Sequence, residues 1–354
     1  MPIKNISLHN IRSYKLYTTD LDERITLILG PNGTGKTTLL ESLYYLCQGT
    51  SFRGRDRDMI SFGTDLGELK ITESNHLIHR SKLQLIDHDK MQKIFYVNDR
   101  KLGRLPVSSR IPVVLFEPDE LRLLSSSPQR RRDFFDGIIA RLSPTYQALL
   151  YRYSRALLQR NELLKREADM TRDTWENHLF AWDVKFAELA HKVATHRREF
   201  ITLSNTRLSD MYSDMAGKKQ HVSAVYHSTI PKTNYQQTLL HALHHNRNSD
   251  ALRGYTSVGP HRDDFLVSLD GHPAIESASR GEMRTIMLSY KLLEVKLQEN
   301  IHHSPPLILM DDVFSELDQA REQHLMQSLK HYQTVITATD LRDELKINAT
   351  IITL

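Results

Sequence analysis

Cysteine and long apolar runs are scarce in this sequence. Its 354 residues include one cysteine, Cys47, which excludes an intramolecular disulfide framework and favours a reducing compartment. No apolar run approaches the roughly 20 residues that a membrane-spanning helix needs. Residues 1–10 lack the apolar segment and cleavage site of a secretory signal. We therefore expect a cytoplasmic protein with no membrane partner.

The chain as a whole also lacks a strong excess of either charge, because its net charge is only +4. The distribution is less even. Residues 129–172 contain ten Arg or Lys against five Asp or Glu, a local charge of +5. Such a run is most often a solvated helix face. The alternative is a surface for a polyanion such as DNA.

Glycine is nearly absent from residues 126–212, where Gly137 is the only one. Apolar residues recur there at helical spacing, and Ser126, Pro128 and Gln129 predict a capped helix start. Elsewhere, short apolar or alternating runs predict strands, at 25–29, 65–97, 111–116, 221–227, 264–269, 307–310 and 334–339. We therefore predict an α/β domain of residues 1–120 and 255–354, split by a mostly helical insert of residues 121–254.

The sequence Gly30-Pro-Asn-Gly-Thr-Gly-Lys-Thr37 matches the phosphate-binding motif G-x-x-x-x-G-K-[ST] in full. It lies between a predicted strand and a predicted helix, which argues against a chance match. Glycines let backbone N–H groups converge on phosphate oxygens, and the helix N-terminus adds partial positive charge. We expect ATP to contact Gly30, Pro31, Asn32, Gly33, Thr34, Gly35, Lys36, Thr37 and Thr38. Lys36 would reach the β- and γ-phosphates in a catalytic role, and Thr37 would offer its hydroxyl to Mg²⁺.

Two adjacent acids follow the apolar run of residues 307–310. Asp311 would hold Mg²⁺ opposite Thr37, and Asp312 would orient and deprotonate the attacking water. Two carboxylates in a turn are uninformative alone. A P-loop in the same chain favours the catalytic interpretation.

A third element is Ser279-Arg-Gly-Glu282, which opens a predicted helix. Ser-x-x-Glu is also a capping box, and both roles can hold at once. We expect Ser279 and Gly281 to contact nucleotide. Ser315-Glu-Leu-Asp318 follows the acids, and a last strand spans residues 334–339. These elements, in this order, are typical of ABC-type ATPases. The chain departs from the transporter pattern, because it lacks Leu-Ser-Gly-Gly-Gln and a His after the last strand.

Further motifs cover nearly the whole chain. They are Asn10-Ile-Arg-Ser-Tyr14, Ser51-Phe-Arg53, Phe116-Glu-Pro-Asp119, Pro128-Gln-Arg-Arg-Arg-Asp-Phe-Phe-Asp136 and Gly259-Pro-His-Arg-Asp-Asp264. With these residues the sequence resembles the RecF family, bacterial recombination mediators related to the SMC and Rad50 ATPases. The family usually has Gln where this chain has Glu282. The roles of His261 and Arg262 do not follow from sequence.

The resemblance implies a P-loop ABC-type ATPase head (lobe I), like that of Rad50, with an inserted helical lobe II. It implies an ATP-dependent homodimer in which each ATP lies between the P-loop of one subunit and Ser279 of the other. It also implies slow ATP hydrolysis and binding to single-stranded DNA and single-strand/double-strand junctions. RecR, with RecO, would be partners in replication, repair and the SOS response.

The basic insert supplies candidates for DNA contact, namely Arg131, Arg132, Arg152, Arg155 and Arg160. Their spacing does not place Arg152, Arg155 and Arg160 on one helix face, so some of them could be structural.

Other functions fit less well. A transporter subunit would need the transporter signature, an SMC head would need a long coiled coil, and a P-loop kinase would lack the signature and the paired acids. Another SMC-like ATPase of DNA maintenance is the main alternative. The histidines at residues 241–245 lack acidic or Cys partners at fixed spacing, so a solvated helix face is favoured over a metal site.

Overall fold

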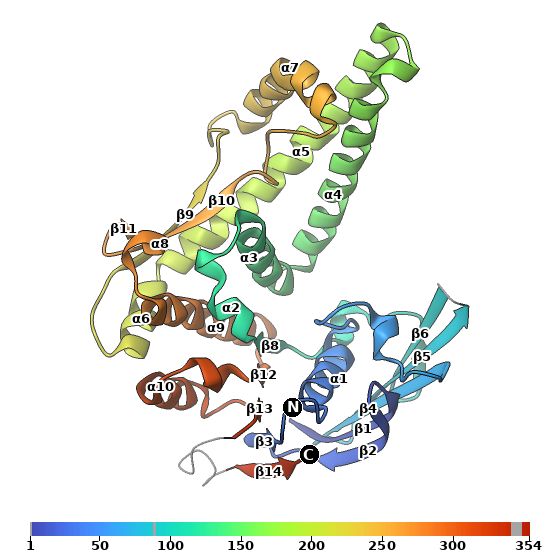
Figure 1. Cartoon of the computed structure of the whole chain (residues 1–354), viewed down its shortest axis with the longest axis vertical. Coiled ribbons are helices and arrows are strands. Elements are labelled where there is room, and N and C mark those ends of the chain that lie inside the picture. The colour runs from blue at the N-terminus through green and yellow to red at the C-terminus, as the bar shows by residue number, and fades with distance from the viewer. Residues whose placement is uncertain (1, 88–89, 341–348) are drawn as a thin grey trace. The chain divides into compact units, whose positions relative to one another are not determined.

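The computed structural model describes residues 2–87, 90–340 and 349–354, and the chain forms two compact units (Figure 1). Unit 1 comprises Met1–Leu121 and Glu294–Leu354, and unit 2 comprises Arg122–Leu293. The first boundary lies one residue from the predicted position. The second differs, because strand β10 (Asp264–Leu269) pairs with β9 (Val222–His227), which is part of the insert. Residues 255–293 therefore pack with the insert, and the division into ATPase domain and insert stays a functional prediction.

Unit 1 is built on a five-stranded parallel sheet in the order β14-β3-β13-β12-β8. Its strands are short, largely apolar segments, as expected where both faces of a parallel sheet are covered. They span Ile25–Leu29 (β3), Val113–Phe116 (β8), Leu307–Asp311 (β12), Thr334–Ala338 (β13) and Thr350–Thr353 (β14). All four pairings are parallel, so the carboxyl ends of these strands share one edge.

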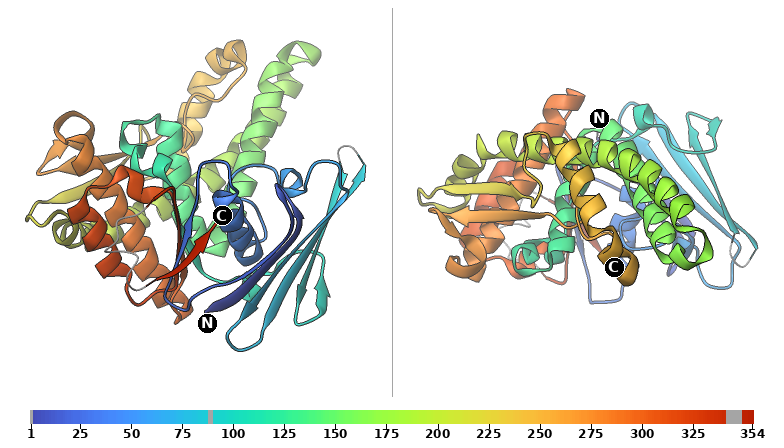
Figure 2. Two further views of the ribbon diagram at one scale, coloured as in Figure 1. Left: turned by 60° about the horizontal axis from the view of Figure 1, so that its bottom comes forward. Right: turned by 90° about the horizontal axis from the view of Figure 1, so that it is seen from above.

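A second sheet of unit 1 is antiparallel and has six strands in the order β2-β1-β4-β5-β6-β7, visible as one twisted sheet in Figure 2. Burial alternates along β4, as expected for a sheet with one covered face. The hairpins predicted between residues 65 and 97 are confirmed. The strands are Ile3–Ile11 (β1), Tyr14–Asp20 (β2), Leu66–Glu73 (β4), Ile78–Asp87 (β5), Lys90–Val97 (β6) and Arg100–Leu102 (β7).

Helix α1 (Lys36–Gln48) contacts strands of both sheets. Leu39, Leu43 and Leu46 lie in the apolar core that the sheets share with it. The helix ends at Gly49, whose φ of 80° suits glycine and whose N–H donates to the Tyr45 carbonyl. The shorter helices of unit 1 are Asp56–Met59 (η1), Val107–Ser109 (η2), Pro118–Leu121 (α2), Val313–Glu316 (η5) and Gln319–Leu329 (α10).

Unit 2 is mostly helical, as predicted, and also contains the three-stranded sheet β11-β10-β9. Helices α4 and α5 form an antiparallel hairpin, and α7 packs against both (Figures 1 and 2). Among the described residues, no helix is both long and apolar enough to cross a bilayer. The elements are Leu123–Ser125 (η3), Pro128–Leu142 (α3), Pro144–Lys165 (α4), Glu167–Asp169 (η4), Arg172–Asn205 (α5), Leu208–Ala216 (α6), Tyr235–Arg253 (α7), His272–Pro273 (β11), Ala274–Ser277 (α8) and Arg280–His302 (α9), which continues into unit 1.

Candidate nucleotide-binding site

The P-loop joins the carboxyl end of β3 to the first turn of α1. Gly33 and Gly35 have φ values of 87° and 105°, which residues with a Cβ rarely adopt. A Cβ on Gly35 would also lie 2.7 Å from the Tyr14 hydroxyl. The loop is therefore a narrow, glycine-dependent cradle at a helix N-terminus, and this geometry fits a phosphate group.

The Lys36 side chain is turned back over this loop. Its ammonium donates to the carbonyl oxygens of Gly30 at 2.6 Å and Pro31 at 2.9 Å. The residue is 7% exposed. The charge is thus held inside the cradle, where it can meet phosphate oxygens.

The predicted metal-binding acid, Asp311, meets the P-loop helix at the shared edge of the parallel sheet. The Thr37 hydroxyl donates to Oδ1 of Asp311 at 2.9 Å, although the residues are 274 positions apart. Thr337, on β13, which lies between β3 and β12, donates its hydroxyl to the same oxygen at 2.8 Å. A hydroxyl and a carboxylate in contact are the oxygen ligands that Mg²⁺ prefers beside a nucleotide.

Asp312 follows directly and is held by backbone geometry. Its N–H donates to the Thr337 carbonyl at 3.1 Å, and its φ is 52°. Burial and the neighbouring Asp311 carboxylate raise the pKa of Asp312 above its ordinary value. A raised pKa makes this carboxylate a better proton acceptor than an ordinary aspartate.

The last strand contributes a further contact. The Thr339 hydroxyl, just beyond β13, donates to Oδ1 of Asn32 in the P-loop at 3.3 Å. The structure thus brings together within unit 1 the P-loop, Asp311, Asp312 and the end of β13. Ser279 and Gly281 belong to unit 2.

A buried ion pair that the sequence did not reveal supports the P-loop helix. Glu41, on α1, is fully buried and accepts from Nη2 of Arg12 at 2.8 Å and from Nε at 3.1 Å. The Ser51 hydroxyl donates to the same carboxylate at 2.5 Å. Two of the family motifs therefore meet at one buried residue of α1. The available signal was a carboxylate among the leucines of α1.

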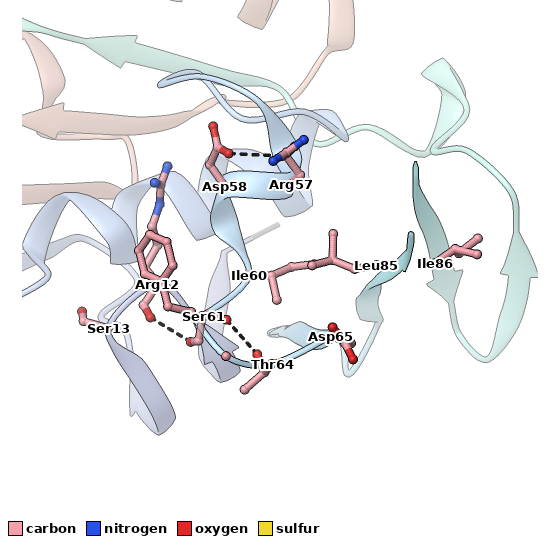
Figure 3. Close-up of a pocket in the computed structure, with 12 residues that line it drawn as sticks. Arg12, Ser13, Arg57, Asp58, Ile60, Ser61, Thr64, Asp65, Leu85 and Ile86 are labelled. Carbon is pink, nitrogen blue, oxygen red and sulfur yellow. Dashed lines mark hydrogen bonds and ion pairs between the residues drawn. The ribbon is translucent and has the colours of Figure 1, made fainter. Parts of the chain in front are cut away.

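A pocket of about 910 Å³ lies beside Arg12, but P-loop residues do not line it (Figure 3). Its apolar wall includes Ile60 and Leu85. The Ser61 hydroxyl closes one side by donating to the Arg12 carbonyl at 2.8 Å. This pocket is therefore separate from the candidate nucleotide site.

Ser279 and Glu282 form the capping box that their spacing allows. The N–H and hydroxyl of Ser279 both donate to Oε2 of Glu282 at 2.9 Å. The Glu282 N–H in turn donates to the Ser279 hydroxyl oxygen at 3.3 Å. The Lys218 ammonium donates to Oε1 of Glu282 at 2.7 Å. Hydrogen bonds from Lys218 and from the Ser279 backbone lower the pKa of Glu282 to about 2.

Three of the five arginines predicted to contact DNA are instead buried in unit 2, Arg131 and Arg160 in ion pairs and Arg132 in hydrogen bonds. Arg131 donates from Nε to Asp264 at 2.9 Å. Arg132 donates to the Asp263 carbonyl at 2.7 Å. Burial and these hydrogen bonds leave Arg131 and Arg132 little open surface for a phosphate. Arg160 is fully buried, with Asp183, Asp250 and Thr256 as acceptors at 2.6, 3.0 and 2.8 Å.

For Arg131, Arg132 and Arg160 the prediction is therefore corrected to a structural role. Arg152 and Arg155 are exposed on α4 and stay candidates for DNA contact.

The motif of residues 259–264 is part of the same buried network. Nε2 of His261 contacts the Thr256 carbonyl at 2.9 Å, so this nitrogen carries the proton, and Nδ1 accepts from the Tyr153 hydroxyl at 2.8 Å. Burial, with the nearby Arg262 cation, lowers the pKa of His261 to about 4. His261 is thus a neutral structural residue. Arg262 lies over the Tyr255 ring at 4.8 Å.

Comparison with known proteins identifies the family. The family model described as RecF/RecN/SMC N terminal domain matches residues 2–349. The DNA replication and repair protein RecF of Agathobacter rectalis is 33% identical over 354 residues, covering 98% of this chain and 94% of that protein. That of Clostridium tetani is 30% identical over 351 residues, covering 97% and 94%.

Solved structures extend the comparison. A recombination mediator protein RecF with ATP, of the RecFOR pathway, has a TM-score of 0.83 at 26% identity, covering 97% of this chain and 93% of that one. An SMC head bound to the C-terminal winged-helix domain of ScpA has a TM-score of 0.55 at 15% identity, covering 100% and 94%, which shows the fold alone. The fold and site define an ABC-type ATPase head of the RecF/RecN/SMC class. Within that class the chain belongs to the RecF family of DNA replication and repair proteins.

Proposed function

We propose that this chain is an ATP-dependent DNA clamp and recombination mediator that dimerises when it binds ATP and Mg²⁺. The contact between the Thr37 hydroxyl and the Asp311 carboxylate carries the proposal, because it joins a phosphate-binding loop to a metal-binding acid. A RecF family member of the RecFOR pathway has been solved with ATP, and 93% of that chain is covered by this one.

Each residue of the site has a chemical task in this proposal. Backbone N–H groups of Gly33 to Lys36 hold phosphate oxygens, and the Lys36 ammonium leaves the loop carbonyls to meet the β- and γ-phosphates. Thr37 and Asp311 would hold Mg²⁺, which supplies charge stabilisation at the transferring phosphoryl group. Asp312 orients a water and accepts its proton.

The segment Ser279-Arg-Gly-Glu282, here called the signature segment, completes the site in the proposed homodimer. Ser279 and Gly281 of one copy approach the terminal phosphate on the P-loop of the other. Bound ATP then stabilises the dimer. Hydrolysis, which we expect to be slow, lets the two copies dissociate. The role differs from that of a metabolic enzyme, because the presence of bound ATP, rather than the rate of ATP turnover, controls the clamp.

DNA is the proposed ligand of the dimer, with Arg152 and Arg155 as phosphate contacts on α4. Both are exposed, as a phosphate contact requires. RecR, with RecO, is the proposed protein partnership, in line with the RecFOR pathway of the solved relative.

The experiment measures the affinity of an Asp312→Asn chain for a single-strand/double-strand junction by fluorescence anisotropy. With ATP–Mg²⁺ we expect at least about tenfold tighter binding than with ADP. Replacing Arg152 and Arg155 by Glu should weaken binding and reduce its salt dependence. Equal affinity with ATP and ADP would contradict the clamp, and an unchanged salt slope would remove these two arginines from the DNA surface.

A further inference from the structure

The N-terminus of α9 carries a carboxylate where the proposed function brings a phosphate. Glu282 lies three residues after Ser279 and accepts both its N–H and its hydroxyl. The Ser279 hydroxyl is therefore already engaged. A terminal phosphate approaching this segment would meet a hydroxyl that points at Glu282 and a negative charge of its own sign, which opposes binding.

Lys218 offsets that charge. It follows Gly217, the left-handed cap of α6, which has a φ of 65°. Its ammonium reaches the Glu282 oxygen that Ser279 does not use, at 2.7 Å. The Glu282 side chain is 20% exposed and that of Lys218 is 53% exposed, so the carboxylate lies mostly within the protein while the ammonium faces water.

The two oxygens of Glu282 thus have separate partners. Oε2 caps α9 through Ser279, and Oε1 binds the cation from the segment between α6 and β9. With Lys218 in place, the carboxylate remains anchored when the Ser279 hydroxyl rotates toward another acceptor. Without Lys218, an uncompensated anion would remain beside the helix N-terminus and cancel its attraction for a phosphate.

We propose that Lys218 is a positioning residue of the signature segment. It neutralises and anchors Glu282, so that the Ser279 hydroxyl can donate to the terminal phosphate of a nucleoside triphosphate bound by a second copy. This inference rests on the proposed ATP-dependent dimer. It assigns Lys218 an indirect task, carried out through Glu282 rather than by contact with the nucleotide.

The test uses the full chain with Asp312→Asn as parent, and it measures the dimer dissociation constant with ATP–Mg²⁺ by sedimentation equilibrium. Lys218→Met should weaken dimerisation on the order of tenfold, since a like charge is then left facing the phosphate. Lys219→Met is the matched control, because this exposed neighbour removes the same charge while the Glu282 ion pair stays. It should lie within about twofold of the parent.

A double-mutant cycle separates positioning from mere structure. Glu282→Gln removes the opposing charge, so adding Lys218→Met to it should have little further effect. Lys218→Arg should restore dimerisation. The affinity of each monomer for ATP should not change, because the P-loop lies in unit 1.

Two outcomes would overturn the role of Lys218. One is a dimer dissociation constant for Lys218→Met equal to that for Lys219→Met. The other is an equal loss in the Glu282→Gln background, which would mean that Lys218 acts directly on the nucleotide or the other copy. A parent that stays monomeric with ATP would instead overturn the proposed function and this inference with it, so the two failures are distinguishable.

Discussion

At the scale of single residues, Arg160 shows how the same side chain can have two opposite interpretations. In the sequence it belongs to a basic segment and is a candidate for a DNA phosphate. In the structure it is fully buried and binds Asp183 and Asp250. Sequence spacing cannot distinguish the two, because the acids that bury it come 23 and 90 residues later.

Arg160→Met therefore tests a structural role. We expect it to lower the free energy of unfolding by about 3–5 kcal/mol, since two buried carboxylates lose their partner. Urea denaturation measures this change. Arg155→Met, on the exposed face of the same helix, should change stability by no more than about 0.5 kcal/mol. Equal stability of the two variants would contradict the buried network.

Two side-chain contacts of unit 1 differ in how far the sequence could predict them. The pairing of Thr37 with Asp311 followed from motifs, because a P-loop and an acid after an apolar run have fixed places at the edge of a parallel sheet. The contact between Arg12 and Glu41 carried no such signal. It depends on tertiary packing of two sequence motifs that no periodicity connects.

At the scale of elements, local signals located most helices and strands, and long-range pairing decided the rest. The helix start expected at Ser126 is real, but Ser127 is its cap and accepts from the Arg130 N–H. Two neighbouring serines before a proline cannot be separated by propensity. The second boundary between the compact units differs from the predicted domain boundary, because the pairing of β9 with β10 joins segments that are separated by α7.

The turn between β3 and α1 depends on glycine at position 35, and a substitution there tests this dependence. Gly35→Ala places a Cβ against Tyr14 and forces a φ of 105° on alanine, at about 1–3 kcal/mol of strain. We expect the ATP-induced rise in melting temperature to be lost or strongly reduced. Gly103→Ala, where a Cβ meets open space, should respond to ATP like the parent. A full ATP response of Gly35→Ala would contradict the cradle.

At the scale of the whole molecule, each copy has one P-loop in unit 1 and one signature segment in unit 2. In the proposed dimer, two copies would form two composite sites, and ATP occupancy would be the signal that joins them. The charges are consistent with this arrangement. The Lys36 ammonium lies in the P-loop, and the Lys218 ammonium offsets the negative charge of Glu282. We propose that the complete site exists only in the dimer.

Light scattering on the Asp312→Asn chain tests that claim most directly. The substitution keeps the P-loop, Thr37 and Asp311 while removing the proposed base, so ATP should bind and persist. We expect the mass of a dimer with ATP–Mg²⁺ and the mass of a monomer with ADP. A monomer with both nucleotides would contradict the composite site and the assigned role of Ser279.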